Sequence, residues 1–319
     1  MAVGVISHLH NLNFAEVREL ARAAEKAGAD WLGLPDAFWW RDTWLLLAEA
    51  ARVTERIEIG PLVTNPYMRH PFHTVAAVAS LQDLAGQRVF VGIGAGGSEV
   101  SGAAGVSRSD APKRVGALSA LLHRVALGQP LDPASGRALE VPLYPAPILI
   151  AGRGSGMLAA AGRWADRALL WAVPSSDLAR SAALISAGAR GRRVNGQRPE
   201  LVWAPLVDHG GASRQRVKTI AAYSVVNSGK DVQARWGLDQ STIARLREVL
   251  VAGGAAAAQN LVPMAALDDL MIADPSPSRI GPMAKRLGAT SMAVPAFSID
   301  EVGEHVKWAR EVLASLLSS

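Results

Sequence analysis

Residues 148–173 read ILIAGRGSGMLAAAGRWADRALLWAV and contain a complete strand–helix–strand unit. The apolar run ILIA ends at Ala151, a Gly-Arg-Gly-Ser-Gly turn follows, a helical segment begins near Met157, and a second apolar run begins at Ala168. Neither run alternates between apolar and polar residues, which is typical of strands buried on both faces of a parallel sheet. This stretch therefore predicts a parallel β-sheet covered by helices.

Apolar runs of this kind recur along the chain, and helical patterns follow most of them. They begin near Val3, Trp31, Ile57, Val89, Ile148, Ala168, Leu201 and Met292. These strand–helix units predict a (β/α)8 TIM barrel, a fold that commonly needs about 250 residues plus insertions. The intervals after the fourth and seventh runs are the longest, so we expect insertions after strands 4 and 7. A doubly wound open sheet is the alternative. Since no segment resembles a linker, we expect one domain over residues 1–319.

Capping signals mark the first and last predicted helices. Asn13 precedes the first helix and Glu16 stands three residues later, which is the spacing of a capping box. Ser298 and Glu301 repeat this spacing ahead of the last helix. We therefore expect the two helices to begin directly after Asn13 and Ser298.

The composition excludes several classes of protein. No cysteine is present, which rules out a disulfide scaffold, a thiolate metal site and a cysteine nucleophile. The net charge of +5 is mild and spread along the chain, so we expect no nucleic-acid partner and favour a small anionic ligand. No apolar run reaches the ~18 residues of a membrane span. The N-terminal segment MAVGVISHLHNLNF also lacks the features of a secretory signal. We therefore expect a cytoplasmic protein that makes no membrane contact.

The candidate functional residues are those at the carboxyl ends of the strands, where TIM barrels place their active sites. They are His8, Asp36, Thr64, Asn65, Gly94 to Ser98, Gly152 to Ser155, Trp171, Asp208, His209 and Phe297. They include no close pair of carboxylates, no histidine spacing typical of a metal site and no Gly-x-Ser-x-Gly motif. We therefore expect no metal. An apolar, aromatic and glycine-containing mouth favours a flat organic cofactor that supplies its own chemistry.

The turn from Gly152 to Ser155 is the strongest local signal. Exposed amides at the start of the following helix, together with the Arg153 side chain, form an anion site, and the glycines allow a phosphate to approach the backbone. Ser155 is placed to cap the helix or to donate to a phosphate oxygen. The alternative is that a tight turn needs glycine in any case and that Arg153 is solvated.

Two other strand ends carry weaker signals. Three glycines, Gly94, Gly96 and Gly97, follow the fourth run. They would let a planar ring lie against the backbone; the alternative is that they relieve crowding inside the barrel. The proline-rich segment 61–71 predicts a rigid bend after the third run, where Thr64 and Asn65 offer hydrogen bonds into the mouth.

Asp36 follows the second run, beside Phe38, Trp39 and Trp40. A carboxyl group among aromatic rings can have a shifted pKa and transfer a proton. The alternatives are a helix cap or a salt bridge to Arg41.

Taken together, these stretches resemble the luciferase-like monooxygenase superfamily, most closely its deazaflavin-dependent branch, which includes methylenetetrahydromethanopterin reductase. The resemblance rests on GPLVTNPYMRHP (60–71), LAGQRVFVGIGAGGSE (84–99), AGRGSGMLAAAGRWADR (151–167) and ADPSPSRIGPMAKRLGATSMAVPA (273–296). It covers nearly the whole chain. The combination in this order is more specific than any one of the motifs.

The resemblance implies a barrel that binds coenzyme F-420 or FMN. It implies a cis peptide bond between Leu62 and Val63 that supports the ring, with further ring contacts at Gly94, Gly96 and Gly97. It places the cofactor phosphate at Gly152, Arg153, Gly154 and Ser155, and it matches Asp36 to an acidic position that reaches the cofactor. We also expect a homodimer.

Two positions depart from the family pattern. Sugar-phosphate dehydrogenases of this group have histidine where this chain has Ala37, and the loop after strand 4 usually carries an acid where this chain has Gly97. The usual acid–base pair is therefore missing. The catalytic candidates that remain are Asp36 and His8, with solvent as the other source of the proton.

These observations predict hydride transfer from reduced F-420 to a C=C or C=N bond of a small organic substrate, with an F-420 reductase as a possible partner. One alternative is an FMN-dependent monooxygenase that works with a flavin reductase, and another is a cofactor-free barrel that only binds a ligand. F-420 has a lactyl-oligoglutamate tail that FMN lacks. We expect basic residues of the second insertion to contact that tail. They are Arg214, Arg216, Lys218 and Lys230.

Overall fold

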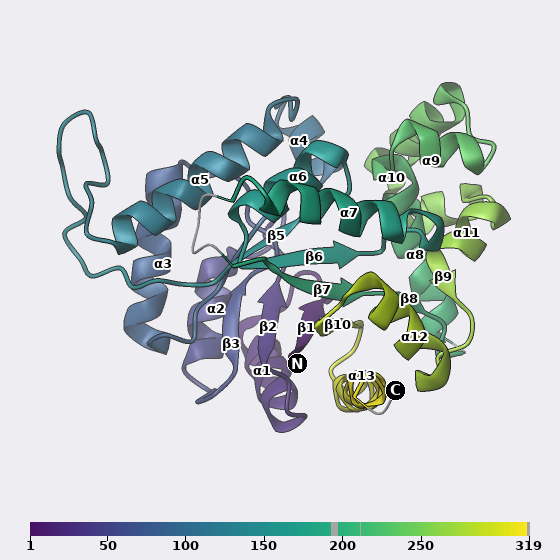
Figure 1. The fold of residues 1–319 in the computed structure, drawn as a ribbon, viewed down its shortest axis with the longest axis horizontal. Helices are drawn as coiled ribbons and strands as arrows, with labels where there is room; N and C mark the ends of the chain where they lie inside the picture. The colour runs from purple at the N-terminus through teal and green to yellow at the C-terminus, as the bar shows by residue number, and fades with distance from the viewer. Residues whose placement is uncertain (193–196, 211, 318–319) are drawn as a thin grey trace.

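The computed structural model describes residues 1–192, 197–210 and 212–317. All the predicted strands are present and form one eight-stranded parallel sheet in the order β3-β2-β1-β10-β7-β6-β5-β4 (Figure 1). They are β1 (Val3–Ser7), β2 (Trp31–Leu34), β3 (Glu58–Pro61), β4 (Val91–Ile93), β5 (Ile148–Ala151), β6 (Arg167–Trp171), β7 (Glu200–Ala204) and β10 (Ser291–Ala296). Isolated parallel bridges, Ile59 to Val89 and Thr64 to Ile93, connect the two outer strands. The sheet is therefore a nearly closed barrel, which confirms the TIM barrel prediction and excludes the open sheet.

Apolar side chains fill both the inside of the barrel and the space between the strands and the helices. The inside holds Ile6, Trp31, Phe90, Leu149, Leu169, Val202, Ala204 and Ala293, all with less than a tenth of their surface exposed. Alternate residues of the same strands face the helices, as Val3, Val5 and Leu32 do. Because both strand faces are buried, the strands are continuously apolar in sequence.

Helices cover the outside of the barrel. They are α1 (Phe14–Lys26), α2 (Thr43–Ala51), α3 (Pro71–Ala85), α5 (Ala111–Ala126), α6 (Ser155–Trp164), the short η1 (Ser175–Asp177), α7 (Leu178–Ala189), α12 (Pro277–Leu287) and α13 (Val302–Ser315). The first insertion, between β4 and β5, adds α4 (Ser98–Ala103) and a long loop after α5. Both insertions lie where the sequence predicts them.

The second insertion follows β7 and lies beyond the carboxyl ends of β6 and β7, at the right of the view in Figure 1. It contains β8 (Leu206–Val207), α8 (Ala212–Asn227), α9 (Lys230–Arg235), α10 (Gln240–Ala258), η2 (Gln259–Leu261), α11 (Met264–Leu270) and β9 (Met271–Ile272). Strands β8 and β9 pair with each other, and the helices share a separate apolar core that includes Val225, Leu246 and Leu267. The insertion therefore forms a packed unit over the mouth of the barrel.

No single helix in the described residues is both long and apolar enough to cross a membrane. The bent pair formed by Gln240–Leu261 and Met264–Leu270 passes such a test together, on length and composition only.

The capping prediction is confirmed for α1 and wrong for α13. The Asn13 side chain accepts hydrogen bonds from the amides of Ala15 and Glu16, and the Glu16 carboxylate accepts one from the Asn13 amide. Helix α13 instead begins after Glu301 without a side-chain cap. The reason is that the Glu301 carboxylate pairs with Arg216 of α8 rather than reaching back to Ser298.

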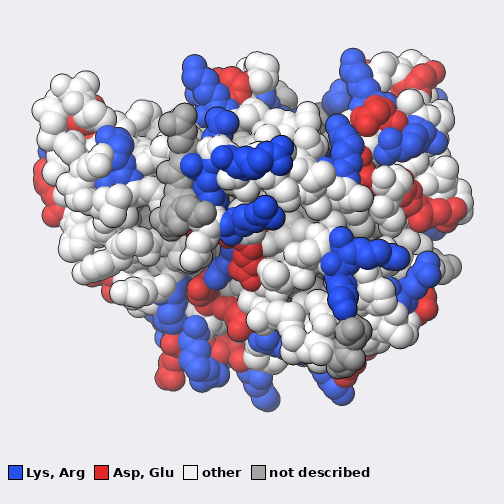
Figure 2. Space-filling view, viewed as in Figure 1, with Lys and Arg blue, Asp and Glu red and all other residues white. Residues whose placement is uncertain are grey.

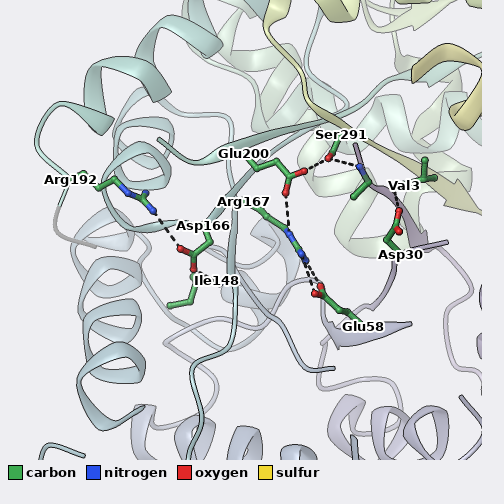
Figure 3. Close-up of polar contacts among 10 residues, drawn as sticks. Val3, Asp30, Glu58, Ile148, Asp166, Arg167, Arg192, Glu200 and Ser291 are labelled. Carbon is green, nitrogen blue, oxygen red and sulfur yellow. Dashed lines mark hydrogen bonds and ion pairs between the residues drawn. The ribbon is translucent and has the colours of Figure 1, made fainter. Parts of the chain in front are cut away.

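Ion pairs close the amino-terminal end of the barrel, opposite the mouth (Figure 3). Arg167 of β6 lies between two carboxylates, with Nε 3.3 Å from Glu200 of β7 and Nη2 3.2 Å from Glu58 of β3. Ser291 of β10 hydrogen bonds to Glu200. Since Arg167 has only 15% of its side chain exposed, these contacts tie together strands from different parts of the barrel at a largely dry site.

Gly4 provides a test of the packing inside the barrel. A Cβ atom at this position would lie 1.9 Å from the nearest atom of the Trp31 indole, which is fully buried. We expect Gly4→Ala to lower the free energy of unfolding by about 1–3 kcal/mol, as overpacked cores do. Urea denaturation followed by circular dichroism measures this change.

The matched control is Gly303→Ala in α13, where nothing lies within 4 Å of the added methyl group. Helix propensity predicts no loss of stability there. Equal effects of the two substitutions would contradict the packing argument.

Candidate active site

A cavity of about 430 Å³ opens at the carboxyl ends of the barrel strands. Its wall is formed by His8, His10, Pro35, Asp36, Ala37, Trp39, Trp40, Leu62, Val63, Gly96, Gly97, Val100, Arg153, Trp171, Arg216, Thr219, Ile220, Tyr223 and Phe297. Most of these residues follow barrel strands, whereas Arg216, Thr219, Ile220 and Tyr223 belong to α8. The second insertion therefore supplies one side of the cavity.

The structure brings nine of the predicted site residues together in this wall. They are His8, Asp36, Leu62, Val63, Gly96, Gly97, Arg153, Trp171 and Phe297. Six other predicted residues are near these in sequence but do not line the cavity. They are Thr64, Asn65, Gly94, Gly152, Gly154 and Ser155. Thr64 and Asn65 are buried, and Gly154 and Ser155 are exposed at the start of α6.

The bend after β3 has the expected geometry, since the peptide bond between Leu62 and Val63 is cis. Strand β4 packs closely against it. A Cβ atom at Gly94 would lie 2.6 Å from Cγ2 of Val63, so this glycine relieves crowding. Gly96, by contrast, lies in the cavity wall with a φ of 76°, a conformation that favours glycine. The crowding explanation therefore accounts for Gly94 but not for Gly96.

Arg153 is a cation without a matching anion. Its Nε donates to the carbonyl oxygen of Trp171 at 3.3 Å, and it has no carboxylate partner among the residues that the structure describes. Burial lowers its pKa to about 10, so the guanidinium remains charged at neutral pH. A partly buried charge of this kind favours an anionic ligand.

The start of α6 adds to the positive potential near Arg153. The helix begins at Ser155, two residues before Met157, and Gly154 is its N-cap without a side-chain hydrogen bond. Ser155 is therefore in the first turn, and the expectation that it caps the helix is wrong. The first-turn amides and the helix dipole favour an anion at this end.

His8 is held between two aromatic rings. Its ring centroid lies 5.0 Å from that of Trp171 and 5.4 Å from that of Phe297. Burial, and to a lesser extent the charge of His10, lowers the pKa of His8 to about 3. Its Nε2 is buried and has no hydrogen-bond partner among the described residues. His8 is therefore a neutral imidazole at pH 7.

Asp36 lies in the wall as a largely buried carboxyl group. Burial raises its pKa above the ordinary value of 3.8, and the nearby charge of Asp42 acts in the same direction. The Thr64 hydroxyl and the charge of Arg69 oppose this rise, although Thr64 Oγ1 makes no hydrogen bond of ordinary geometry within the described chain. Asp36 therefore keeps its proton to a higher pH than an exposed carboxyl group does.

Both structural alternatives for Asp36 are wrong. Asp42, not Asp36, caps α2 by accepting from the amide of Trp44 at 2.9 Å. Arg41 donates to the carbonyl and side-chain oxygens of Asn11 rather than to Asp36.

A second cavity of about 510 Å³ adjoins the first and shares Asp36, Ala37 and Trp40 with it. Asn65 lies in its wall, with Oδ1 accepting from the amides of Tyr67 and Met68. This cavity is more polar than the first, since its wall also holds Asp42, Arg69, His70 and His73.

Some wall residues were not predicted from the sequence. His10 stacks on Trp40 with ring centroids 4.3 Å apart, and its position two residues after His8 is the signal that could have found it. Thr219, Ile220 and Tyr223 of α8 carry no local signal in the sequence.

Other predicted residues are absent from the wall. Asp208 and His209 lie elsewhere, with His209 stacked on His305. Among the basic residues expected near a cofactor tail, only Arg216 lines the cavity, and its guanidinium is 2.5 Å from Glu301. The side chain of Arg214 lies outside the described part of the structure.

Comparison with known proteins places this geometry in a family. The family model named luciferase-like monooxygenase matches residues 1–282. The curated 5,10-methylenetetrahydromethanopterin reductase of Archaeoglobus fulgidus is 25% identical over 254 residues, which cover 77% of this chain and 76% of that protein.

Solved structures show the same fold. The coenzyme F-420-dependent tetrahydromethanopterin reductase from Methanopyrus kandleri has a TM-score of 0.77 at 21% identity, with 99% of each chain covered. An F-420-dependent secondary alcohol dehydrogenase in complex with an F-420–acetone adduct has a TM-score of 0.72 at 17% identity, with 98% of each chain covered.

The lowered pKa of His8 predicts a specific pH dependence of stability. Below pH 6.5 the unfolded chain binds a proton at His8 that the folded chain does not bind until about pH 3. The free energy of unfolding should therefore fall as the pH drops through this range, by at most about 1.4 kcal/mol per pH unit from this group. His8→Gln should reduce that slope.

Urea denaturation at a series of pH values measures the slope independently of any uniform loss of stability in the variant. His73→Gln, at an exposed position on α3, is the control and should keep the wild-type slope. If His8→Gln and His73→Gln have the same slope, His8 is not a neutral buried imidazole.

Proposed function

Since the chain belongs to the luciferase-like monooxygenase family, we propose that it transfers a hydride between reduced coenzyme F-420 and a C=C or C=N bond of a small organic substrate. The named relatives support F-420 as the cofactor, since the reductase and the dehydrogenase with the same fold are both F-420-dependent. A separate F-420 reductase would supply the reduced cofactor.

The observation that carries the proposal is the unpaired charge of Arg153 beside the uncapped start of α6. A cation buried without a carboxylate reduces stability unless a ligand neutralises it. The phosphate of the cofactor would fit here, held by Arg153 and by the backbone of Gly152, Gly154 and Ser155. The residues present therefore fit an anionic cofactor.

The remaining wall fits a planar ring. Leu62 and Val63 would support one face of the ring, and Gly96 and Gly97 would let it lie close to the backbone. Reduced F-420 supplies a hydride when it is bound. Aromatic side chains around the cavity, such as Trp171 and Phe297, exclude water from this space.

Addition of a hydride to a polarised double bond also requires a proton. Asp36 is the proton donor in this proposal, because burial keeps its carboxyl group protonated to a higher pH than usual. His8 is neutral, so it would orient the substrate through a hydrogen bond at Nε2 rather than transfer a proton from an imidazolium. Asp36→Asn and His8→Gln would distinguish the two roles, because each variant replaces the side chain with a neutral amide.

Arg153→Gln should weaken cofactor binding without a matching loss of stability. A charge-assisted contact contributes about 1.5–3 kcal/mol, which corresponds to a roughly 10- to 100-fold higher Kd. The free energy of unfolding should fall by less than about 1 kcal/mol, because the substitution removes an unpaired charge and one long hydrogen bond. Fluorescence titration with F-420 and with FMN, beside thermal unfolding, measures both effects.

The same titration distinguishes the alternatives. Preference of the wild-type protein for FMN would favour the monooxygenase, and binding of neither cofactor would favour the cofactor-free barrel. A lower melting temperature of Arg153→Gln with an unchanged Kd would mean that Arg153 is structural.

Asp36→Asn should reduce turnover at least tenfold and change F-420 affinity much less, since general acid catalysis contributes about 10²–10⁴ in rate. The wild-type rate should fall as the pH rises through the raised pKa of Asp36, and this dependence should disappear in Asp36→Asn. Oxidation of reduced F-420 in the presence of a panel of activated alkenes and imines, beginning with 2-cyclohexen-1-one, measures the rate. Loss of cofactor binding in Asp36→Asn, with loss of turnover in His8→Ala, would reverse the two roles.

A further inference from the structure

The second cavity, of about 510 Å³, lies next to the site assigned to hydride transfer. Its volume is within the range of roughly 300–1,000 Å³ that is typical of small-molecule sites. It shares Asp36, Ala37 and Trp40 with the first cavity, so the proposed proton donor lies on the boundary between the two. In the proposed function the first cavity holds the planar ring of the cofactor. A substrate that reacts beside Asp36 can therefore extend into the second cavity.

Asn65 is the most buried side chain in the wall of this second cavity, with 3% of its surface exposed. Its Oδ1 accepts from the amides of Tyr67 and Met68 at 3.1 and 3.0 Å, which fixes the orientation of the side-chain amide. Its Nδ2 lies near Gly96, where an added Cβ atom would be 3.5 Å away, and donates no hydrogen bond to any described residue. A buried donor without an acceptor lowers stability, so Nδ2 favours a ligand that supplies an acceptor.

His70 adds a second donor to the same wall. It is the N-cap of α3, and its Nδ1 accepts from the amide of Phe72 at 3.2 Å. The proton of the neutral imidazole is then on Nε2, which makes that atom a donor. His70 makes no other hydrogen bond within the described ranges. The wall therefore offers two donors, from the loop after β3 and from the start of α3.

The charges in the wall favour an uncharged ligand group. Nη2 of Arg69 lies 2.7 Å from Oδ2 of Asp42, so this pair is neutral as a unit. Figure 2 shows Lys and Arg side chains gathered over α6 and α7, and no residue of these helices lines the second cavity. In the described part of the wall, no arginine or lysine lacks a carboxylate partner. Free donors without a free cation suit a carbonyl oxygen better than an anion.

Trp40 provides an apolar surface on the boundary between the cavities. Its ring stacks on that of His10, with centroids 4.3 Å apart and planes 6° from parallel, which holds the indole in place. Phe38 adds a second aromatic ring to the wall. A flat apolar segment of a ligand can lie against these rings.

We propose that the second cavity binds an uncharged carbonyl group of the substrate, such as a ketone, an ester or an amide, through Asn65 Nδ2 and His70 Nε2. This inference rests on the proposed function. It narrows the substrate to unsaturated compounds that carry a carbonyl group apart from the double bond that is reduced.

The test uses three forms of 4-phenyl-3-buten-2-one, an activated alkene, that differ only in the group para on the phenyl ring. The groups are acetyl, its apolar isostere isopropenyl, and carboxylate. Equilibrium dialysis of each compound with the protein and oxidised F-420 measures Kd without turnover. The wild-type protein should bind the acetyl compound at least fivefold more tightly than the isopropenyl compound, because only the acetyl group accepts hydrogen bonds. The carboxylate compound should bind no more tightly than the isopropenyl compound.

Asn65→Asp should abolish the preference for acetyl over isopropenyl. The aspartate can still accept from the amides of Tyr67 and Met68, but it has no N–H to donate. His70→Asn keeps an N-cap side chain and removes the Nε2 donor, so it should reduce the preference in part. This second variant tests the site even if Asn65→Asp does not fold, which circular dichroism would show.

Asn13→Asp is the matched control. Oδ1 of Asn13 also accepts from the amides two and three residues later, those of Ala15 and Glu16. Asn13 is exposed ahead of α1 and lines neither cavity. This variant makes the same chemical change in the same local geometry and should keep the full preference.

The outcomes separate the inference from the proposed function. Equal binding of the acetyl and isopropenyl compounds by the wild-type protein, tightest binding of the carboxylate compound, or an unchanged preference in Asn65→Asp overturns the inference. Oxidation of reduced F-420 by these alkenes tests the proposed function separately. Oxidation without the preference rejects the carbonyl site and leaves hydride transfer, whereas the preference without oxidation supports the carbonyl site and rejects hydride transfer to these bonds.

Discussion

The rest of the structure depends on closure of the parallel sheet between β3 and β4. A Cβ atom at Gly60 would lie 2.2 Å from the carbonyl oxygen of Phe90, and one at Gly92 would lie 2.2 Å from that of Pro61. Only glycine allows the two backbones to approach this closely. Because the strands meet here, the loops that follow them reach the mouth together. Residues far apart in sequence then share one cavity wall.

The arginines at the two ends of the barrel differ in whether carboxylates surround them. At the amino-terminal end, Arg167 is surrounded by Glu58 and Glu200 and stabilises the fold. At the mouth, Arg153 has only a carbonyl oxygen of Trp171 as a partner. An unpaired cation contributes nothing to stability that a neutral side chain could not supply, and this is why our proposal assigns Arg153 to a ligand. The contrast separates the structural charges from those available to a ligand.

The sequence predicts the barrel well because its signals are local. Strands buried on both faces are continuously apolar, and the capping box of α1 needs only Asn13 and Glu16. The signal for the turn that contains Arg153 is equally local, since the strand, the glycines and the helix follow one another in the sequence. These features do not depend on any long-range contact.

The parts that the sequence could not predict depend on contacts between distant segments. Tyr223 and its neighbours enter the wall only because the second insertion packs over the mouth. Glu301 fits a capping box in sequence but pairs with Arg216 in space.

Our proposal of Asp36 as the proton donor rests on the charges in the wall. Asp36 is the single acidic residue among the described side chains that form it. Burial acts in opposite ways on the two candidates, since it raises the pKa of a carboxyl group and lowers that of an imidazole. A ligand that fills the cavity removes more water and increases both shifts. An anionic ligand near Arg153 also cancels the positive charge that would otherwise favour the carboxylate. Cofactor binding would therefore make Asp36 a better proton donor and leave His8 neutral.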